Sequence, residues 1–234
     1  MSTPTLDPLI NCRILSSTVE PQKLIWLALH TCYSSEPVDE CPYTETRAGG
    51  AVVNSLLKGG RGHYSPLEQA HMSIAMSFVP HNVMQQLTRH RLLSFSVQSF
   101  RYTRLSLEDP ECCVYIRQEG TYASREGTYV YSAEQRALDL HRATEQLHLY
   151  GKALETGMPP EQARGLLPFD IRQHLVAGGN LRAWLHVLDL RLKADAQPEI
   201  QQLCTQIEDL LTTWCPQILE WYSNNRRGKA MLSP

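Results

Sequence analysis

Residues 70–91 of the chain read AHMSIAMSFVPHNVMQQLTRHR. From Ala70 to Phe78, apolar side chains alternate with small or polar ones, which is the period of two expected of a half-buried strand. Pro80 ends this strand, because proline has no N–H to donate to a neighbouring strand. The apolar residues after Pro80 follow helical spacing, so we expect a short helix that ends near Arg89-His90-Arg91.

Cap and breaker residues place the other elements along the chain. Ser132 and Gln135 form a capping box that begins a long helix, and Asn180 is a typical N-cap before another. Long helices mixed with a few separated strands predict one α+β domain over residues 1–234. We expect strands at 10–16, 70–78 and 169–177, helices at 21–32, 44–58, 83–89, 132–157, 160–167, 180–192 and 198–215, extended chain at 94–103, and an irregular insertion or loose strands at 105–131.

Composition excludes several classes of protein. Of the 234 residues, 42% are hydrophobic and 20% are charged, which suits a globular core and excludes a disordered or collagen-like chain. No run of about 18 uncharged apolar residues occurs, so we expect no membrane span, and the first residues show no secretion signal. Seven cysteines without a Cys-x-x-Cys pair favour free thiols and a cytoplasmic location, and we expect no bound metal.

Charge is distributed unevenly, although the net charge is only −2. Between Glu68 and Glu108 the sequence has no acidic residue and no lysine, but it has four arginines and three histidines. Arginine without lysine, beside apolar runs, indicates fixed recognition of an anion. A protein that binds duplex nucleic acid would carry a wider basic surface, so the expected partner is a small anion.

The residues after Arg89-His90-Arg91 suggest how that anion is bound. Arg89 and Arg91 alone could be cations that complement the C-terminal dipole of a helix. That interpretation does not account for Ser99 and Arg101, which in extended chain would point to one side, about 7 Å apart. A hydroxyl and a guanidinium in this arrangement suit a phosphate group. The common nucleotide-binding loops and the serine-nucleophile elbow are absent from the sequence.

Five ordered motifs, which cover roughly residues 10–215, resemble those of one enzyme family. Arg89-His90-Arg91, followed by seven residues and then Ser99, is similar to the signature of flavin-dependent thymidylate synthases. The N-terminal segment His30-Thr31-Cys32-Tyr33-Ser34 also resembles an element of that family. The other matching motifs are Gly62-His63-Tyr64-Ser65-Pro66-x-Glu68, Ala163-Arg164-x-x-Leu167-Pro168, Asn180-Leu181-Arg182 followed by Leu190-Arg191, and Ala196-Gln197-x-Glu199-Ile200.

The resemblance implies a reaction, a fold and an assembly. Members of the family make dTMP from dUMP, with FAD as hydride carrier, methylene-tetrahydrofolate as carbon donor and NADPH as reductant. They have a mainly antiparallel sheet with several long helices, and they assemble as homotetramers whose active sites are shared between subunits. Neither nucleic acid nor a membrane is an expected partner.

The resemblance also implies roles for individual residues. Arg191 would be the catalytic residue, because its permanent charge beside the pyrimidine would favour the ionised form of that ring. No protein nucleophile is implied. FAD would be bound by Ser65, Arg89, His90, Arg91, Asn180, Leu181, Arg182 and His186, and dUMP by Gln86, Arg89, Gln98, Ser99, Arg101 and Arg164.

Several positions depart from the family pattern. Gln69 stands where a histidine is frequent, Ser96 and Val97 where Asn and Glu are common, and His186 where an asparagine is common. These differences concern hydrogen bonds around the flavin and near the nucleotide. The side chain of Val97 forms no hydrogen bond at all, so it is excluded from the expected site.

One alternative function comes from a different class. A non-enzymatic protein could bind nucleotides or nucleic acid through the same arginines, and it would then bind long polyanions in a salt-sensitive way. Such a protein would be colourless, whereas a flavoprotein is yellow. His63 has two interpretations of its own, a satisfied core histidine or a residue of the site.

Overall fold

The computed structural model describes residues 6–59, 62–105, 107–124 and 127–229. It divides the chain into two compact units. The first unit consists of the described parts of 1–11, 76–86 and 96–175, and the second of those of 12–75, 87–95 and 176–234. The assignment of residues 1–234 to one domain stays a prediction.

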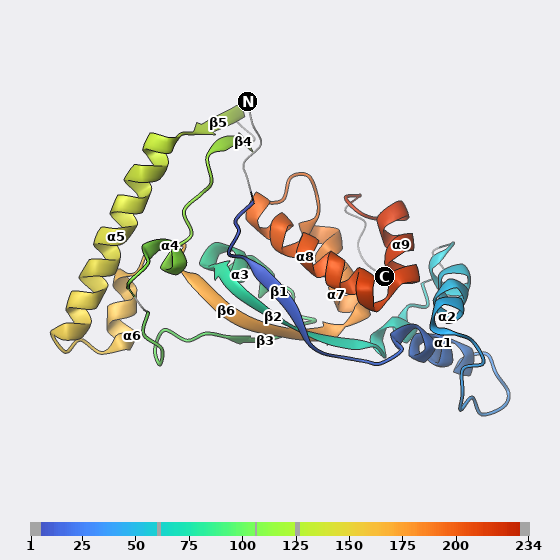
Figure 1. Ribbon diagram of the computed structural model, residues 1–234. Coiled ribbons are helices and arrows are strands. Elements are labelled where there is room, and N and C mark those ends of the chain that lie inside the picture. Colours follow the sequence, from blue (N-terminus) through green and yellow to red (C-terminus); the bar gives the residue numbers. More distant parts are fainter. Residues whose placement is uncertain (1–5, 60–61, 106, 125–126, 230–234) are drawn as a thin grey trace. The chain divides into compact units, whose positions relative to one another are not determined.

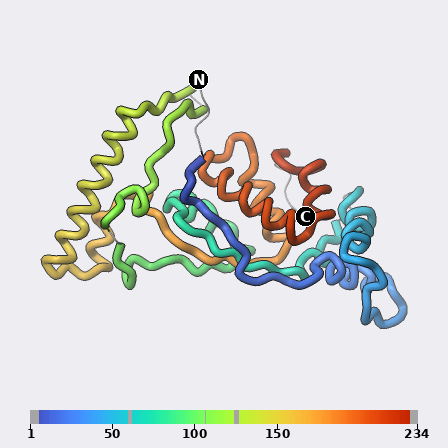
Figure 2. The backbone as a smooth tube through the Cα atoms, viewed as in Figure 1, coloured from blue at the N-terminus to red at the C-terminus, as the bar shows by residue number. Residues whose placement is uncertain are grey.

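The main sheet has four strands in the order β1-β2-β6-β3 (Figure 1). They are β1 (Asn11–Ser17), β2 (His71–Pro80), β6 (Arg172–Asn180) and β3 (Ser94–Val97). Figure 2 shows the backbone of β2 and β6 side by side, although the two strands are far apart in the sequence.

The strands of this sheet are antiparallel. Hydrogen bonds at the strand ends join the end of each strand to the beginning of its neighbour, which is the antiparallel arrangement. The predicted antiparallel sheet is therefore confirmed. These bonds run from Thr18 N to His71 O (2.9 Å), His81 N to Ile171 O (2.9 Å), Leu181 N to Ala70 O (2.9 Å) and Gln98 N to His174 O (2.8 Å).

The long helices begin where the local signals predict. The Oγ of Ser132 accepts a hydrogen bond from Gln135 N at 3.2 Å, and the Oδ1 of Asn180 accepts one from Ala183 N at 2.8 Å. Both predicted N-caps are confirmed. None of the described helices is long and apolar enough to cross a membrane. The helices are α1 (Pro21–Thr31), α2 (Glu45–Val52), α3 (His81–Leu87), α4 (Pro110–Cys113), α5 (Ala133–Glu155), α6 (Pro160–Ala163), α7 (Leu181–Arg191), α8 (Pro198–Trp214) and α9 (Pro216–Asn225).

The prediction of extended chain at 94–103 is wrong beyond Val97. The chain turns at Ser99, whose carbonyl accepts hydrogen bonds from Tyr102 N at 3.1 Å and Thr103 N at 2.9 Å. The hydroxyl of Thr103 also donates to this carbonyl, at 2.9 Å. Local bonds of this kind, made by serine and threonine, compete with strand pairing. The strand therefore ends before Ser99.

Two further stretches differ from the predicted elements. Within 105–131 the chain forms α4 and an antiparallel hairpin of β4 (Gly120–Ser124) and β5 (Gly127–Tyr131), in which Tyr122 pairs with Tyr129. This outcome agrees with loose strands rather than with an irregular insertion, although 106, 125 and 126 lie outside the described residues. The helix α9 lies beyond the predicted elements, because a proline such as Pro216 is typical of the end of the preceding helix and here begins a new one.

Each unit has its own apolar packing. In the first unit, residues on α5 pack against the end of α4, and Leu147 on α5 is buried together with Cys113 and Val114. In the second unit, Trp184 on α7 is fully buried, and its indole Nε1 donates to Met72 O on β2 at 3.2 Å. This contact holds α7, which carries His186 and Arg191, against the sheet (Figure 1).

Candidate functional site

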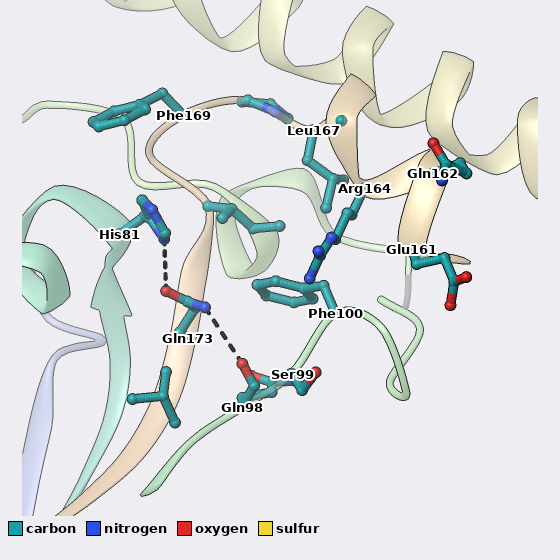
Figure 3. A pocket seen from close by; sticks show the side chains of 14 residues that line it. His81, Gln98, Ser99, Phe100, Glu161, Gln162, Arg164, Leu167, Phe169 and Gln173 are labelled. Atoms are coloured by element: carbon teal, nitrogen blue, oxygen red, sulfur yellow. Dashed lines mark hydrogen bonds between the residues drawn. The ribbon is translucent and has the colours of Figure 1, made fainter. Parts of the chain in front are cut away.

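A cavity of about 730 Å³ lies in the first unit (Figure 3). It is lined by the segment after β3, by α6 with the turn that follows it, and by the beginning of β6. The aromatic rings of Phe100 and Phe169 form part of its wall, together with the polar side chains of His81, Ser99 and Arg164. Both the volume and the mixture of rings with a few polar groups are typical of small-molecule sites, which measure about 300–1,000 Å³.

A chain of hydrogen bonds runs along one wall of this cavity. His81 Nδ1 lies 2.8 Å from Oε1 of Gln173, and Nε2 of Gln173 donates to the carbonyl of Gln98 at 3.4 Å (Figure 3). On its other side, His81 Nε2 lies 3.0 Å from the amide nitrogen of Gln85. An amide oxygen accepts and an amide nitrogen donates, so the ring of His81 fits both partners with its proton on Nδ1. Gln173 is only 4% exposed, so the chain of bonds is anchored in the protein.

The residues expected to bind dUMP do not all line the cavity. Ser99 and Arg164 do, and in Figure 3 the guanidinium of Arg164 points toward Phe100. Gln98 also lines it, but its amide has protein partners: Oε1 accepts from the backbone N of His174 at 3.1 Å. Gln86, on α3, is outside the lining residues.

Ser99 and Arg101 do not have the predicted relationship. In place of two side chains on one side of a strand, the Oγ of Ser99 accepts from the backbone N of Arg101 at 3.3 Å inside the turn. Arg101 is outside the cavity lining, and its Nε forms an ion pair with Oε2 of Glu161 at 3.1 Å. The predicted geometry of this pair is therefore wrong, because the turn after Val97 changes the direction of the chain.

The Arg89-His90-Arg91 segment forms a tight turn in the second unit. The backbone N of His90 donates to Leu87 O at 3.0 Å, and Leu93 N donates to His90 O at 3.1 Å. This turn exposes the side chains of Arg89 and Arg91 and buries the ring of His90. The alternating arginines therefore face solvent, while the residue between them packs inside.

His90, His186 and Arg191 form one cluster, which the structure brings together from the turn and from α7. The Nε of Arg191 lies 2.9 Å from Nε2 of His90, and the rings of His90 and His186 are 5.7 Å apart. Burial lowers the pKa of His90 to about 4, and the electrostatic effects of Arg191 and of the titratable ring of His186 add to this. Burial also lowers the pKa of His186 and that of Arg191. Both histidines are therefore neutral at physiological pH, and Arg191 supplies the positive charge of the cluster.

The beginning of α7 is joined to a second motif. Arg182 forms an ion pair with Glu68 at 2.5 Å, which links the predicted cofactor segment at Asn180 to the turn that Ser65 begins. Ser65 is exposed, whereas the side chain of Leu181 is fully buried. Leu181 can therefore offer a ligand only its backbone.

His63 is not a core histidine, because its ring is only half-buried. Its Nδ1 lies 3.1 Å from the hydroxyl of Tyr33, and its Nε2 lies 3.8 Å from Sγ of Cys32. Both of these partners belong to the N-terminal segment that resembles the family.

Sequence reasoning missed His81, Phe100, Phe169 and Gln173 as cavity residues. His81 had a signal, since it directly follows Pro80 in the window without acidic residues. Gln173 and the two phenylalanines stand outside any motif, so no local pattern could identify them. Val97, although it forms no side-chain hydrogen bonds, lines the cavity with its apolar side chain.

Comparisons with known proteins agree over most of the chain. A family model described as "Thymidylate synthase complementing protein" matches residues 13–217. A protein of Haloarcula marismortui named flavin-dependent thymidylate synthase is 32% identical, over 94% of this chain and 98% of its own length. A protein of Halobacterium salinarum with the same name is 33% identical, over 95% of this chain and 99% of its own length.

The fold is also similar to solved structures. A UMP/dUMP methylase, PolB from Streptomyces cacaoi, bound with 5-Br dUMP, matches 96% of this chain and 97% of its own with a TM-score of 0.78. The two sequences are 24% identical. The structure of the same methylase bound with 5-Br UMP gives a TM-score of 0.72. These likenesses confirm the mixed fold with an antiparallel sheet and several helices.

Proposed function

The chain belongs to the family of flavin-dependent thymidylate synthases, and we propose that it catalyses the reductive methylation of dUMP to dTMP. The carbon donor is methylene-tetrahydrofolate and the reductant is NADPH, with FAD as hydride carrier. The protein acts in the cytoplasm as a homotetramer with shared active sites. A non-enzymatic binding protein is disfavoured, because the relatives that match nearly the whole chain are named as enzymes.

One observation carries the nucleotide part of this proposal: Arg164 and Ser99 lie together at a cavity of about 730 Å³ that also has aromatic walls. The guanidinium and the hydroxyl bind the phosphate, and the rings of Phe100 and Phe169 contact the apolar faces of the nucleotide. The UMP/dUMP methylase with a similar fold was solved with a brominated dUMP, which supports a nucleotide of this size. The other proposed dUMP residues are Gln86, Arg89, Gln98 and Arg101.

To bind the phosphate, Arg101 exchanges its ion pair with Glu161 for one with the nucleotide. Its ion pair with Glu161 joins two side chains that are about half exposed, and such pairs contribute only about 0–1 kcal/mol. A phosphate carries more charge than a carboxylate and accepts two parallel N–H bonds from a guanidinium. The bound nucleotide therefore competes well with Glu161 for Arg101.

The second unit fits an FAD diphosphate by the chemistry of its donors. The first turn of α7 has no acidic residue, so the partial positive charge of this helix end is available to an anion. Arg89 and Arg91 expose two further cations, and Ser65 exposes a hydroxyl. FAD, when bound, carries hydride from NADPH to the new methyl group. The proposed FAD residues are Ser65, Arg89, His90, Arg91, Asn180, Leu181, Arg182 and His186.

Arg191 is the proposed catalytic residue. Its guanidinium keeps its charge at any physiological pH, and it lies beside two neutral histidines. A fixed positive charge stabilises negative charge that develops on the pyrimidine ring, and it does so without a proton transfer.

Stopped-flow spectroscopy of the purified, full-length protein tests the proposed function. We expect bound FAD to lose its absorbance on addition of NADPH, and to lose it faster when dUMP is present. With methylene-tetrahydrofolate added, dTMP should form. A protein whose flavin spectrum stays unchanged with NADPH, and which forms no dTMP, would contradict the proposal.

A further inference from the structure

His90 accepts a hydrogen bond from a residue far away in the sequence. Nε of Arg191 is 2.9 Å from Nε2 of His90, across a separation of 101 positions. A guanidinium has only donors, so the N–H belongs to Arg191 and Nε2 of His90 is unprotonated. The direction of this bond is therefore fixed by chemistry.

The surroundings hold the ring of His90 in one place. The ring is 5% exposed, and its backbone is held in the turn by bonds to Leu87 and Leu93. His186, on α7, meets it edge to face at an interplanar angle of 74°. Because burial and the neighbouring cation disfavour the protonated ring, the acceptor is present throughout the neutral pH range.

A neutral acceptor suits Arg191 better than a carboxylate would. A carboxylate would orient the guanidinium, but its negative charge would offset the positive charge. A neutral imidazole orients the guanidinium and does not offset its positive charge. The charge of Arg89 and the thiol of Cys204 also act on the pKa of Arg191. Burial raises the pKa of the Cys204 thiol, so this group is uncharged.

We propose that His90 is a positioning residue that fixes the orientation of the Arg191 guanidinium on α7. The consequence for catalysis rests on the proposed function: an arginine that points in one direction meets the ionised pyrimidine without first losing rotamer freedom. The side-chain atom Nε2 of His90 is used for this bond, so any contact of His90 with FAD involves its backbone or another part of the ring.

Two substitutions at His90 separate positioning from other roles. In His90→Gln the amide oxygen can take the place of Nε2 as an acceptor, whereas His90→Leu removes the acceptor and keeps an apolar side chain. We expect His90→Leu to lower kcat for dTMP formation by about tenfold to hundredfold, with the KM for dUMP nearly unchanged. At saturating FAD, the loss of kcat in His90→Gln should be at least about threefold smaller than the loss in His90→Leu. The matched control is His141→Leu, an exposed histidine on α5, which should change neither constant.

Two measurements do not depend on turnover. In the ¹⁵N spectrum of the full chain, the Nε–H signal of Arg191 should be protected from exchange in the wild type and in His90→Gln, and lost in His90→Leu. Its assignment comes from Arg191→Ala. Titration with FAD gives the Kd of each His90 variant, and kcat is compared at saturating FAD, so that loss of the proposed FAD contact of His90 is separated from loss of the orientation of Arg191.

A mutant cycle completes the test. If His90 acts through Arg191, adding His90→Leu to Arg191→Ala should cause no further loss of kcat. The proposal is overturned if the two losses multiply, if His90→Leu keeps the protected Nε–H signal, or if kcat of His90→Leu at saturating FAD is normal. A wild-type protein that makes no dTMP would refute the proposed function, and the Nε–H signal would still decide whether His90 orients Arg191.

Discussion

Arg101 and Glu161 form an ion pair, Nε to Oε2 at 3.1 Å, and Glu161 is one of the residues that line the cavity of the first unit. A carboxylate in the wall of a proposed phosphate site repels the ligand and also occupies one of the arginines expected to bind it. We expect both effects to weaken the binding of dUMP at the proposed site.

Removal of that carboxylate should strengthen nucleotide binding. Glu161→Gln leaves Arg101 without its ionic partner and removes a negative charge from the cavity, so we expect the Kd for dUMP to fall by about twofold to fivefold. Calorimetry in low and high salt checks this, since the gain should shrink as salt screens the charges. The control is Glu145→Gln, an exposed carboxylate on α5. An unchanged Kd would mean that Arg101 does not compete for the phosphate.

The affinity for dUMP should depend on the planar shape of the Arg101 guanidinium as well as on its charge. Arg101→Lys keeps the charge but loses the two parallel N–H donors, so dUMP should bind more weakly by about 1.5–3 kcal/mol. Calorimetry with dUMP and with deoxyuridine, which has no phosphate, provides the comparison. If deoxyuridine loses as much affinity as dUMP, Arg101 does not bind the phosphate.

Loss of the proposed catalytic charge should slow dTMP formation far more than it slows the reduction of the flavin by NADPH. We expect Arg191→Ala to form dTMP about 10²–10³ times more slowly, the usual effect of removing a preorganised stabiliser of developing charge. Oxidation of NADPH in the absence of dUMP should continue at nearly the wild-type rate. A rate of dTMP formation within about threefold of wild type would contradict the catalytic role.

His90 should make the stability of the protein depend on pH. Its pKa is lowered to about 4 in the folded state, and the ordinary value of 6.5 applies to the unfolded chain. The unfolded state therefore binds more protons between these values, and the contribution of His90, on the order of 3 kcal/mol, is complete above pH 6.5 and is lost as the pH falls toward 4. Urea unfolding at pH 7 and pH 4.5 should show a smaller loss of stability in His90→Gln than in the wild type. An equal loss would mean that another group causes the pH dependence.

The buried ion pair of Arg226 and Asp189 should be needed for folding. Arg226 follows α9 and donates to Asp189 on α7 at 2.8 Å, and both side chains are buried. Arg226→Met leaves the carboxylate buried without its partner, which should lower the free energy of unfolding by about 3–5 kcal/mol. In Asp189→Leu/Arg226→Met both charges are gone, so much of this stability should return. The pair has no such role if Arg226→Met unfolds at the same urea concentration as the wild type.

Much of the fold could be predicted because its signals are local. The capping bonds of Ser132 and Asn180 each span three residues, and the alternation in β2 needs only the side chains of one strand. The turn at Ser99 was missed, although it is also local, because the same residues are compatible with extended chain. The bonds of Tyr102 and Thr103 to the carbonyl of Ser99 form the turn.

The candidate site was predictable only in part. Motif order identified the family and proposed Ser99 and Arg164, which line the cavity, but it did not show that Gln173 joins His81 to Gln98 along the cavity wall. His81 and Gln173 are 92 positions apart, and a glutamine outside any motif carries no sign of such a partner.

Local chemistry thus specified the strand that Pro80 ends, the helices that begin after Ser132 and Asn180, and the order of motifs that places the chain in its family. Those features depend on hydrogen bonds and periodicities within a few residues. The meeting of His90 with Arg191, and of Arg182 with Glu68, depends instead on how a turn, a strand and α7 pack together, across separations of 101 and 114 positions. Burial then shifts the pKa of His90, so the charge state of this cluster follows from the packing of the folded chain.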